Sequence, residues 1–178
     1  MVRYSRRGKE WKKVLSILKT NGRISACALG KKLNFSRQKA WHVITDLEKN
    51  EVIWGYSVVI DENKINQNNF IVLIKRTNKL LNETLIEKIC HEEFNSLVEE
   101  GQDIFIESIF CVYGSFDWIL IINASDIVTV KSFISNLQLN LDEYIDQVVL
   151  LESVITMKKN WIRNPEIEKG NDIVKKLL

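Results

Sequence analysis

The chain has 178 residues, of which 46% are hydrophobic and 27% charged, so it can bury a core and is not a disordered protein. One proline and seven glycines exclude collagen-like and proline-rich classes, and no apolar run reaches the roughly 18 residues that a membrane-spanning helix needs. Three widely spaced cysteines and a polar, basic start, unlike a secretory signal, predict a cytoplasmic protein without a disulfide framework.

Positive charge is concentrated at the N-terminus. Residues 1–50 contain 13 Lys/Arg and 3 Asp/Glu, a net charge of +10, whereas residues 51–178 contain 12 and 20, a net charge of −8. A basic module joined to an acidic one is typical of proteins that bind nucleic acid. A merely solvated basic surface is the alternative reading of charge alone.

The first fifty residues predict three helices. The first carries apolar residues at helical spacing and ends at Asn21-Gly22, and Ser25 and Ser36 are suited to cap a second and a third helix. A short helix, a tight turn and a capped basic helix form a helix-turn-helix. The apolar stripes are Trp11, Val14, Leu15 and Leu18 in the first helix and Ala40, Val43, Ile44 and Leu47 in the third.

The face of the third helix opposite its apolar stripe is the candidate DNA-binding surface. Glutamine can pair with adenine and arginine with guanine in the major groove, while lysine neutralises phosphates. For Trp41 the equal alternative is packing against the first helix, and for Arg37 and Lys39 it is a solvated face. The expected DNA contacts are Ser36, Arg37, Gln38, Lys39, Trp41, His42 and Thr45.

The remainder of the chain predicts a strand over residues 52–60, a polar linker, and then the order β-α-β-β-α-β. Strands are expected over residues 70–75, 104–112, 117–123 and 147–157, and helices over residues 79–98 and 130–141. This order is the ferredoxin-like fold, with two helices on one face of a four-stranded antiparallel sheet. Because the strands are apolar on both sides, we expect a homodimer that covers the other face.

Two segments resemble the Lrp/AsnC (feast/famine) transcriptional regulators. NGRISACALGKKLNFSRQKAWHVITDLEKNEVIWGYSVVID is similar to that family's helix-turn-helix and following strand, and VYGSFDWILII to its glycine turn. The resemblance implies dimers or higher even-numbered oligomers that bind double-stranded DNA, often with an amino-acid effector. The effector residues it implies are Gly114, Phe116 and Asp117, and for Asp117 the alternative is a turn residue that holds its own backbone.

The predicted class is therefore α+β, with an N-terminal winged or helix-turn-helix domain and a C-terminal ferredoxin-like domain. The expected divisions are a DNA-binding domain over residues 1–51, a β linker over 52–68, an oligomerisation and effector domain over 69–157 and a C-terminal extension over 158–178.

The chain departs from the family pattern in several places, three of which bear on its structure. Glu51 replaces the usual glycine before Val52, so we expect Asn50 to take the left-handed helix end. Residues 1–9 add a basic arm that extends along the DNA backbone or into a minor groove, or else is disordered. The tail over residues 160–178 exceeds the usual end, and residues 173–178 either form a short helix against a partner subunit or are disordered.

Two other functions compete with DNA binding. Siroheme decarboxylases share the architecture, but this chain has only His42 and His91 and no metal-ligand spacing or cofactor motif. We therefore expect no enzyme activity, no metal and no cofactor. The other alternative is an effector-sensing oligomer without specific DNA binding, which the +10 charge of the first fifty residues disfavours.

Overall fold

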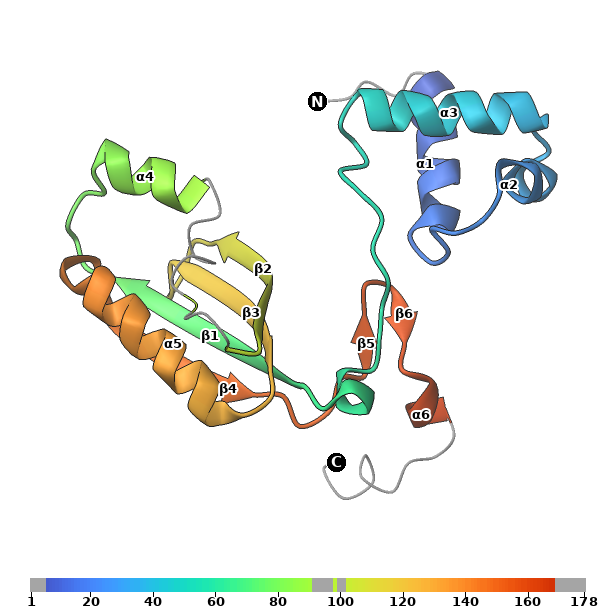
Figure 1. Cartoon of the computed structure of the whole chain (residues 1–178). Coiled ribbons are helices and arrows are strands. Elements are labelled where there is room, and N and C mark those ends of the chain that lie inside the picture. The colour runs from blue at the N-terminus through green and yellow to red at the C-terminus, as the bar shows by residue number, and fades with distance from the viewer. Residues whose placement is uncertain (1–5, 91–97, 99–101, 169–178) are drawn as a thin grey trace. The chain divides into compact units, whose positions relative to one another are not determined.

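The computed structural model describes residues 6–90, 98 and 102–168, and the chain divides into two compact units (Figure 1). One comprises residues 1–60 and 156–178, hereafter the helical unit, and the other residues 61–155, the sheet unit. The helical unit holds 19 Lys/Arg and 7 Asp/Glu, a net charge of +12, and the sheet unit 6 and 16, a net charge of −10. The C-terminal stretch thus adds to the positive charge of the helices.

Three helices form the helical unit: α1 (Arg6–Leu18), α2 (Ala26–Leu33) and α3 (Arg37–Lys49). Both predicted caps are confirmed, because the Ser25 Oγ accepts a hydrogen bond from the Ala28 amide at 3.2 Å and the Ser36 Oγ one from the Lys39 amide at 3.1 Å. The predicted stripes meet in a core of Val14, Leu18, Leu29, Ala40, Val43 and Leu47. The helix-turn-helix is therefore confirmed.

The C-terminal end of α3 corrects one expectation. Asn50 is not left-handed (φ −94°), and Glu51 takes that conformation instead (φ 54°). The Val52 amide donates to the Leu47 carbonyl at 2.9 Å and the Glu51 amide to the Glu48 carbonyl at 3.0 Å, which together form a Schellman motif. Asn50 uses its side chain, whose Nδ2 donates to the Asp46 carbonyl at 2.7 Å.

Replacing Glu51 by glycine should stabilise the protein. A side chain at positive φ is strained, and glycine relieves that strain, so Glu51→Gly should raise the free energy of unfolding by about 0.5–1 kcal/mol. Asn50→Gly is the matched control and should lower it, since that position has ordinary φ. Urea unfolding followed by circular dichroism measures both, and a destabilised Glu51→Gly variant would contradict the assignment.

The strand predicted over residues 52–60 does not form, and with it the wing is missing from the described residues. These residues are extended but pair with no other described strand. They attach to the helices through side chains instead: Ile53 packs against the helical core, and the Tyr56 hydroxyl donates to the Glu48 Oε1 at 2.8 Å. A β-prone sequence without a neighbouring strand has no ladder to join.

Both ends of the chain differ from expectation where they are described. Residues 6–9 of the expected basic arm belong to α1, and residues 1–5 lie outside the described residues. The C-terminal extension forms a hairpin of β5 (Lys158–Lys159) and β6 (Ile162–Arg163), followed by α6 (Pro165–Glu168). The short helix expected over residues 173–178 lies outside the described residues.

The sheet unit has the predicted ferredoxin-like topology. Its elements are η1 (Glu62–Ile65), β1 (Asn68–Arg76), α4 (Glu83–Cys90), β2 (Ile104–Cys111), β3 (Trp118–Ala124), α5 (Ile127–Asn140), η3 (Asp142–Tyr144) and β4 (Ile145–Glu152). The strands are antiparallel in the order β2-β3-β1-β4. Strand β4 ends at Glu152, earlier than expected, and the second half of the helix expected over residues 79–98 lies mostly outside the described residues.

One face of this sheet is covered and the other is open. Helix α5 lies along the sheet (Figure 1). Phe70, Val72 and Ile74 of β1 are fully buried in a core shared with Phe133 and Leu137 of α5. Side chains alternate along a strand, so the opposite face carries the intervening residues. The middle of that face is apolar, with Asn69, Asn123 and Lys75 toward its ends. Its apolar residues include Ile71, Leu73, Ile119, Ile121, Val149 and the more than half-exposed Phe105 and Phe110.

No helix among the described residues is long and apolar enough to cross a membrane.

Candidate nucleic-acid interface

The start of α3 is fixed by a close approach to α2. A Cβ on Gly30 would lie 2.7 Å from the Phe35 carbonyl oxygen and 3.3 Å from that of Ser36, so only glycine allows this contact. The Gly30 carbonyl accepts a hydrogen bond from the Phe35 amide at 2.9 Å, and Asn34 between the helices is left-handed (φ 56°). The turn therefore sets the orientation of α3 relative to α2.

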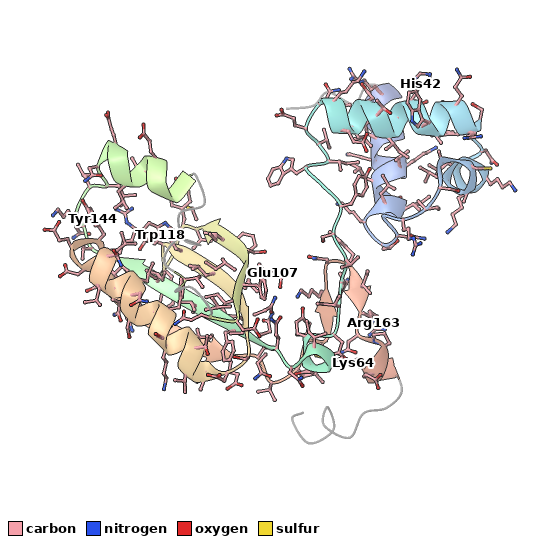
Figure 2. All side chains as sticks on the ribbon, in the orientation of Figure 1. His42, Lys64, Glu107, Trp118, Tyr144 and Arg163 are labelled. Carbon is pink, nitrogen blue, oxygen red and sulfur yellow. The ribbon has the colours of Figure 1, made fainter. Side chains whose placement is uncertain are left out.

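The exposed side of α3 borders an open groove between it and α1. Six of the seven residues predicted to contact DNA line this groove, and Arg37 is exposed beside it at the first turn. His42 points outward from the helix in Figure 2. The lining residues are Glu10, Ser36, Gln38, Lys39, Trp41, His42, Val43, Thr45, Asp46 and Lys49.

Trp41 is not buried against α1. Its side chain is 54% exposed, and its ring lies 5.0 Å from that of His42 between centroids, tilted by 59°. An indole held half in solvent on a basic helix is available to stack on or contact another molecule.

Lys39 is tied to the protein rather than freely solvated. Its Nζ lies 2.6 Å from the Glu10 Oε1 and 4.3 Å from the centroid of the Phe35 ring. The charge of Lys39 is therefore partly compensated by a residue of α1, which the sequence analysis did not anticipate.

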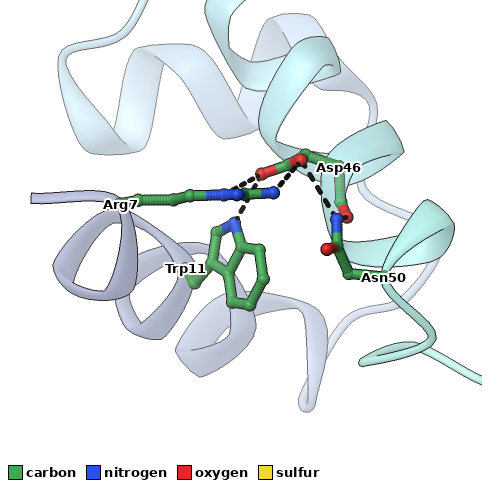
Figure 3. Close-up of polar contacts among 4 residues, drawn as sticks. All are labelled: Arg7, Trp11, Asp46 and Asn50. Carbon is green, nitrogen blue, oxygen red and sulfur yellow. Dashed lines mark hydrogen bonds and ion pairs between the residues drawn. The ribbon is translucent and has the colours of Figure 1, made fainter. Parts of the chain in front are cut away.

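Asp46 forms the densest polar cluster of the groove (Figure 3). The Arg7 Nε donates to its Oδ2 at 2.8 Å and the Arg7 Nη2 to its Oδ1 at 2.5 Å. The Trp11 Nε1 donates to Oδ2 at 3.0 Å and the Asn50 Nδ2 to Oδ1 at 3.2 Å. The hydrogen bonds from Arg7, together with those from Trp11 and Asn50, lower the pKa of Asp46. The hydrogen bond to Asp46 in turn raises the pKa of Arg7.

The sequence did not predict a polar cluster of Arg7, Glu10, Trp11 and Asp46, because 29 to 39 residues separate the hydrogen-bonded partners. The available signal was the scarcity of acids, since Glu10, Asp46 and Glu48 are the three in residues 1–50. Each of the three accepts a hydrogen bond from a side chain, and the donor to Glu48 is the Tyr56 hydroxyl. Partial burial and the hydrogen bond to Glu48 raise the pKa of Tyr56 to about 12. No acid among them is left to face an anionic partner unpaired.

The three residues implied for an effector lie together at the turn between β2 and β3. Gly114 has a φ of 149°, and Phe116 is half-buried. The Asp117 Oδ2 accepts a hydrogen bond from the Arg76 amide at 2.8 Å, and the Asp117 amide donates to the Ile74 carbonyl at 2.9 Å. Asp117 therefore binds the end of β1 to the turn.

His91, the second of the two histidines considered for an enzyme activity, lies outside the described residues. Within the described ranges, no three His, Cys, Asp or Glu side chains are grouped so that they could hold a metal ion.

Several solved structures share this fold. They include an AsnC family transcriptional regulator from Agrobacterium tumefaciens (20% identity, 92% of this chain and 98% of that chain, TM-score 0.65) and LrpC from B. subtilis (22%, 83% and 94%, 0.59). The chain has the Lrp/AsnC fold. A third structure, a transcriptional regulator from Neisseria meningitidis in complex with L-Met, gives 16% identity, 85% and 92% coverage and a TM-score of 0.62.

No protein-family model and no curated protein sequence matches this chain. The Lrp/AsnC fold is therefore recognised at identities of 22% or less in these three structures, with more than nine-tenths of each solved chain aligned. Both the helical unit and the sheet unit belong to the shared architecture, since each neighbour aligns with more than four-fifths of this chain.

The contact at Gly30 can be tested directly. Gly30→Ala forces a methyl group against the backbone of the turn, so we expect the free energy of unfolding to fall by about 1–3 kcal/mol. Gly55→Ala is the control, because a Cβ there meets no atom within 4 Å. Thermal unfolding of both variants measures the difference, and equal stability of the two would show that α2 and the turn are less closely packed.

Proposed function

We propose that this protein is a sequence-specific DNA-binding transcriptional regulator of the Lrp/AsnC type that acts as a homodimer. The observation that carries the proposal is the solvent-exposed polar face of α3, which belongs to a unit with a net charge of +12. An α-helix fits the major groove, and positive charge around it releases counterions from the phosphates. The shared Lrp/AsnC fold supports the same reading.

Arg37 and Gln38 are the proposed base-reading residues. Both are exposed at the N-terminal turn of α3, which in helix-turn-helix proteins approaches base edges. Ser36 caps the helix, so its hydroxyl already has one partner, and it serves to place the two residues that follow it.

Substituting these residues should weaken binding in a sequence-dependent way. Arg37→Ala and Gln38→Ala should each cost about 1–3 kcal/mol on the best genomic site and relax base preference there. Gel-shift titrations against that site and against bulk DNA measure the effect. Lys31→Ala, at an exposed position of α2, is the control. Equal losses on every sequence would reassign the residues to phosphate contacts, and no preferred genomic fragment would refute specificity.

An amino acid is the proposed effector, bound near Gly114, Phe116 and Asp117. The support is the fold shared with the Neisseria meningitidis regulator that was solved with L-Met. Because the Asp117 carboxylate already holds the Arg76 amide, an effector there would couple to the joint between β1 and the turn. Repeating the DNA titrations with each amino acid tests this part of the proposal.

The open face of the sheet is the proposed dimer contact. Leu73 of β1 lies opposite Ile119 of β3 and Val149 of β4, so the middle of this face is aliphatic across three strands. An exposed apolar face of this kind is typical of association surfaces between protein chains. Two-fold symmetry would bring the same face of a second copy against it. Such a dimer would offer two α3 helices to one duplex.

A charge in the middle of that face should break the dimer. Leu73→Arg would have to bury its guanidinium between two sheets, so we expect a monomer of about 20.8 kDa instead of twice that mass. Leu139→Arg, on an exposed site of α5, is the matched control and should remain dimeric. Size-exclusion chromatography with light scattering measures both, and a dimeric Leu73→Arg variant would place the interface elsewhere.

A further inference from the structure

Two ion pairs of opposite sense join α1 and α3. Arg7 and Glu10 lie about one turn apart on α1, and Asp46 and Lys39 lie about two turns apart on α3. Arg7 binds Asp46, and Glu10 binds Lys39. Helix α1 therefore cancels one negative and one positive charge on the helix that carries the candidate base-reading residues.

The hydrogen-bonding capacity of Asp46 is fully used. A carboxylate has about four acceptor sites, and Asp46 accepts two hydrogen bonds at each oxygen, from Arg7, Trp11 and Asn50. It therefore has no remaining lone pair with which to accept a hydrogen bond from a base. Its other effect on DNA would be repulsion of phosphates, since it lies in the groove beside His42, Thr45 and Lys49.

The geometry of Arg7 suits neutralisation better than a phosphate contact. Two donors on one edge of its guanidinium, Nε and Nη2, are committed to Asp46 in a fork, and its central carbon lies 4.9 Å from the centroid of the Trp11 ring. A guanidinium held by a carboxylate and stacked on an indole gives up those contacts if it turns toward a phosphate.

We propose that Arg7 is a positioning residue of the DNA interface, which neutralises Asp46 and holds its carboxylate away from the phosphates without contacting DNA itself. This inference rests on the proposed function. It makes the first helix, outside the helix-turn-helix proper, a determinant of how strongly α3 is attracted to DNA. Glu10 acts in the opposite direction by withholding the charge of Lys39.

The test is a set of charge-removing variants measured on the best genomic site at about 0.1 M salt. Arg7→Gln exposes the Asp46 charge and should weaken binding about three- to tenfold, and Arg7→Gln/Asp46→Asn should return affinity to within about twofold of wild type. Glu10→Gln frees Lys39 and should strengthen binding by a similar factor. Arg23→Gln, an exposed arginine in the turn between α1 and α2, is the control for total charge and should have a smaller effect than Arg7→Gln.

The salt dependence separates neutralisation from direct contact. If Arg7 does not touch a phosphate, the slope of log affinity against log salt stays the same in Arg7→Gln, whereas loss of a phosphate contact lowers it by about 0.9. Thermal unfolding confirms that each variant is folded. A double variant as weak as Arg7→Gln, or an Arg23→Gln loss equal to that of Arg7→Gln, would overturn this inference alone, whereas absence of DNA binding by the wild-type protein would overturn the proposed function as well.

Discussion

The close contact between α2 and the start of α3 is the constraint on which the candidate interface depends. Because Gly30 has no Cβ, the backbone of the turn at Phe35 can pack closely against α2. Ser36, the residue after Phe35, then caps α3. These two features decide which residues of α3 face outward. A shift of one residue in the start of α3 would rotate every side chain by about 100° and turn Gln38 and His42 away from the groove.

The three helices α1, α2 and α3 could be predicted because their signals are local. Serine caps and apolar residues at spacings of three and four reveal helices α2 and α3 without knowledge of the fold. Those spacings also give the exposed face of α3, including Gln38, Trp41 and His42. The pairing of Arg7 with Asp46 could not be predicted in this way, since it depends on how α1 crosses α3. Nor could the left-handed conformation of Glu51, because asparagine and glycine are the residues that ordinarily adopt it at a helix end.

The strands could be predicted only in part. The topology of the sheet unit followed from the order of apolar segments, and the register confirms it. Residues 52–60 have the composition of a strand and yet form none, because strand formation needs a partner that composition cannot supply. For Asp117, residue type alone left an effector ligand and a turn residue as alternatives, and the structure adds its hydrogen bond to the Arg76 amide.

The segregation of charge has a consequence for the protein in solution. Because the chain joins a unit of +12 to one of −10, the unlike units of two molecules attract each other. This attraction is long-ranged in dilute buffer and is screened beyond about 10 Å at 0.1 M ionic strength. The proposed dimer contact is apolar and would not be weakened by such screening, so added salt would distinguish electrostatic association of the chains from dimerisation through the sheet face.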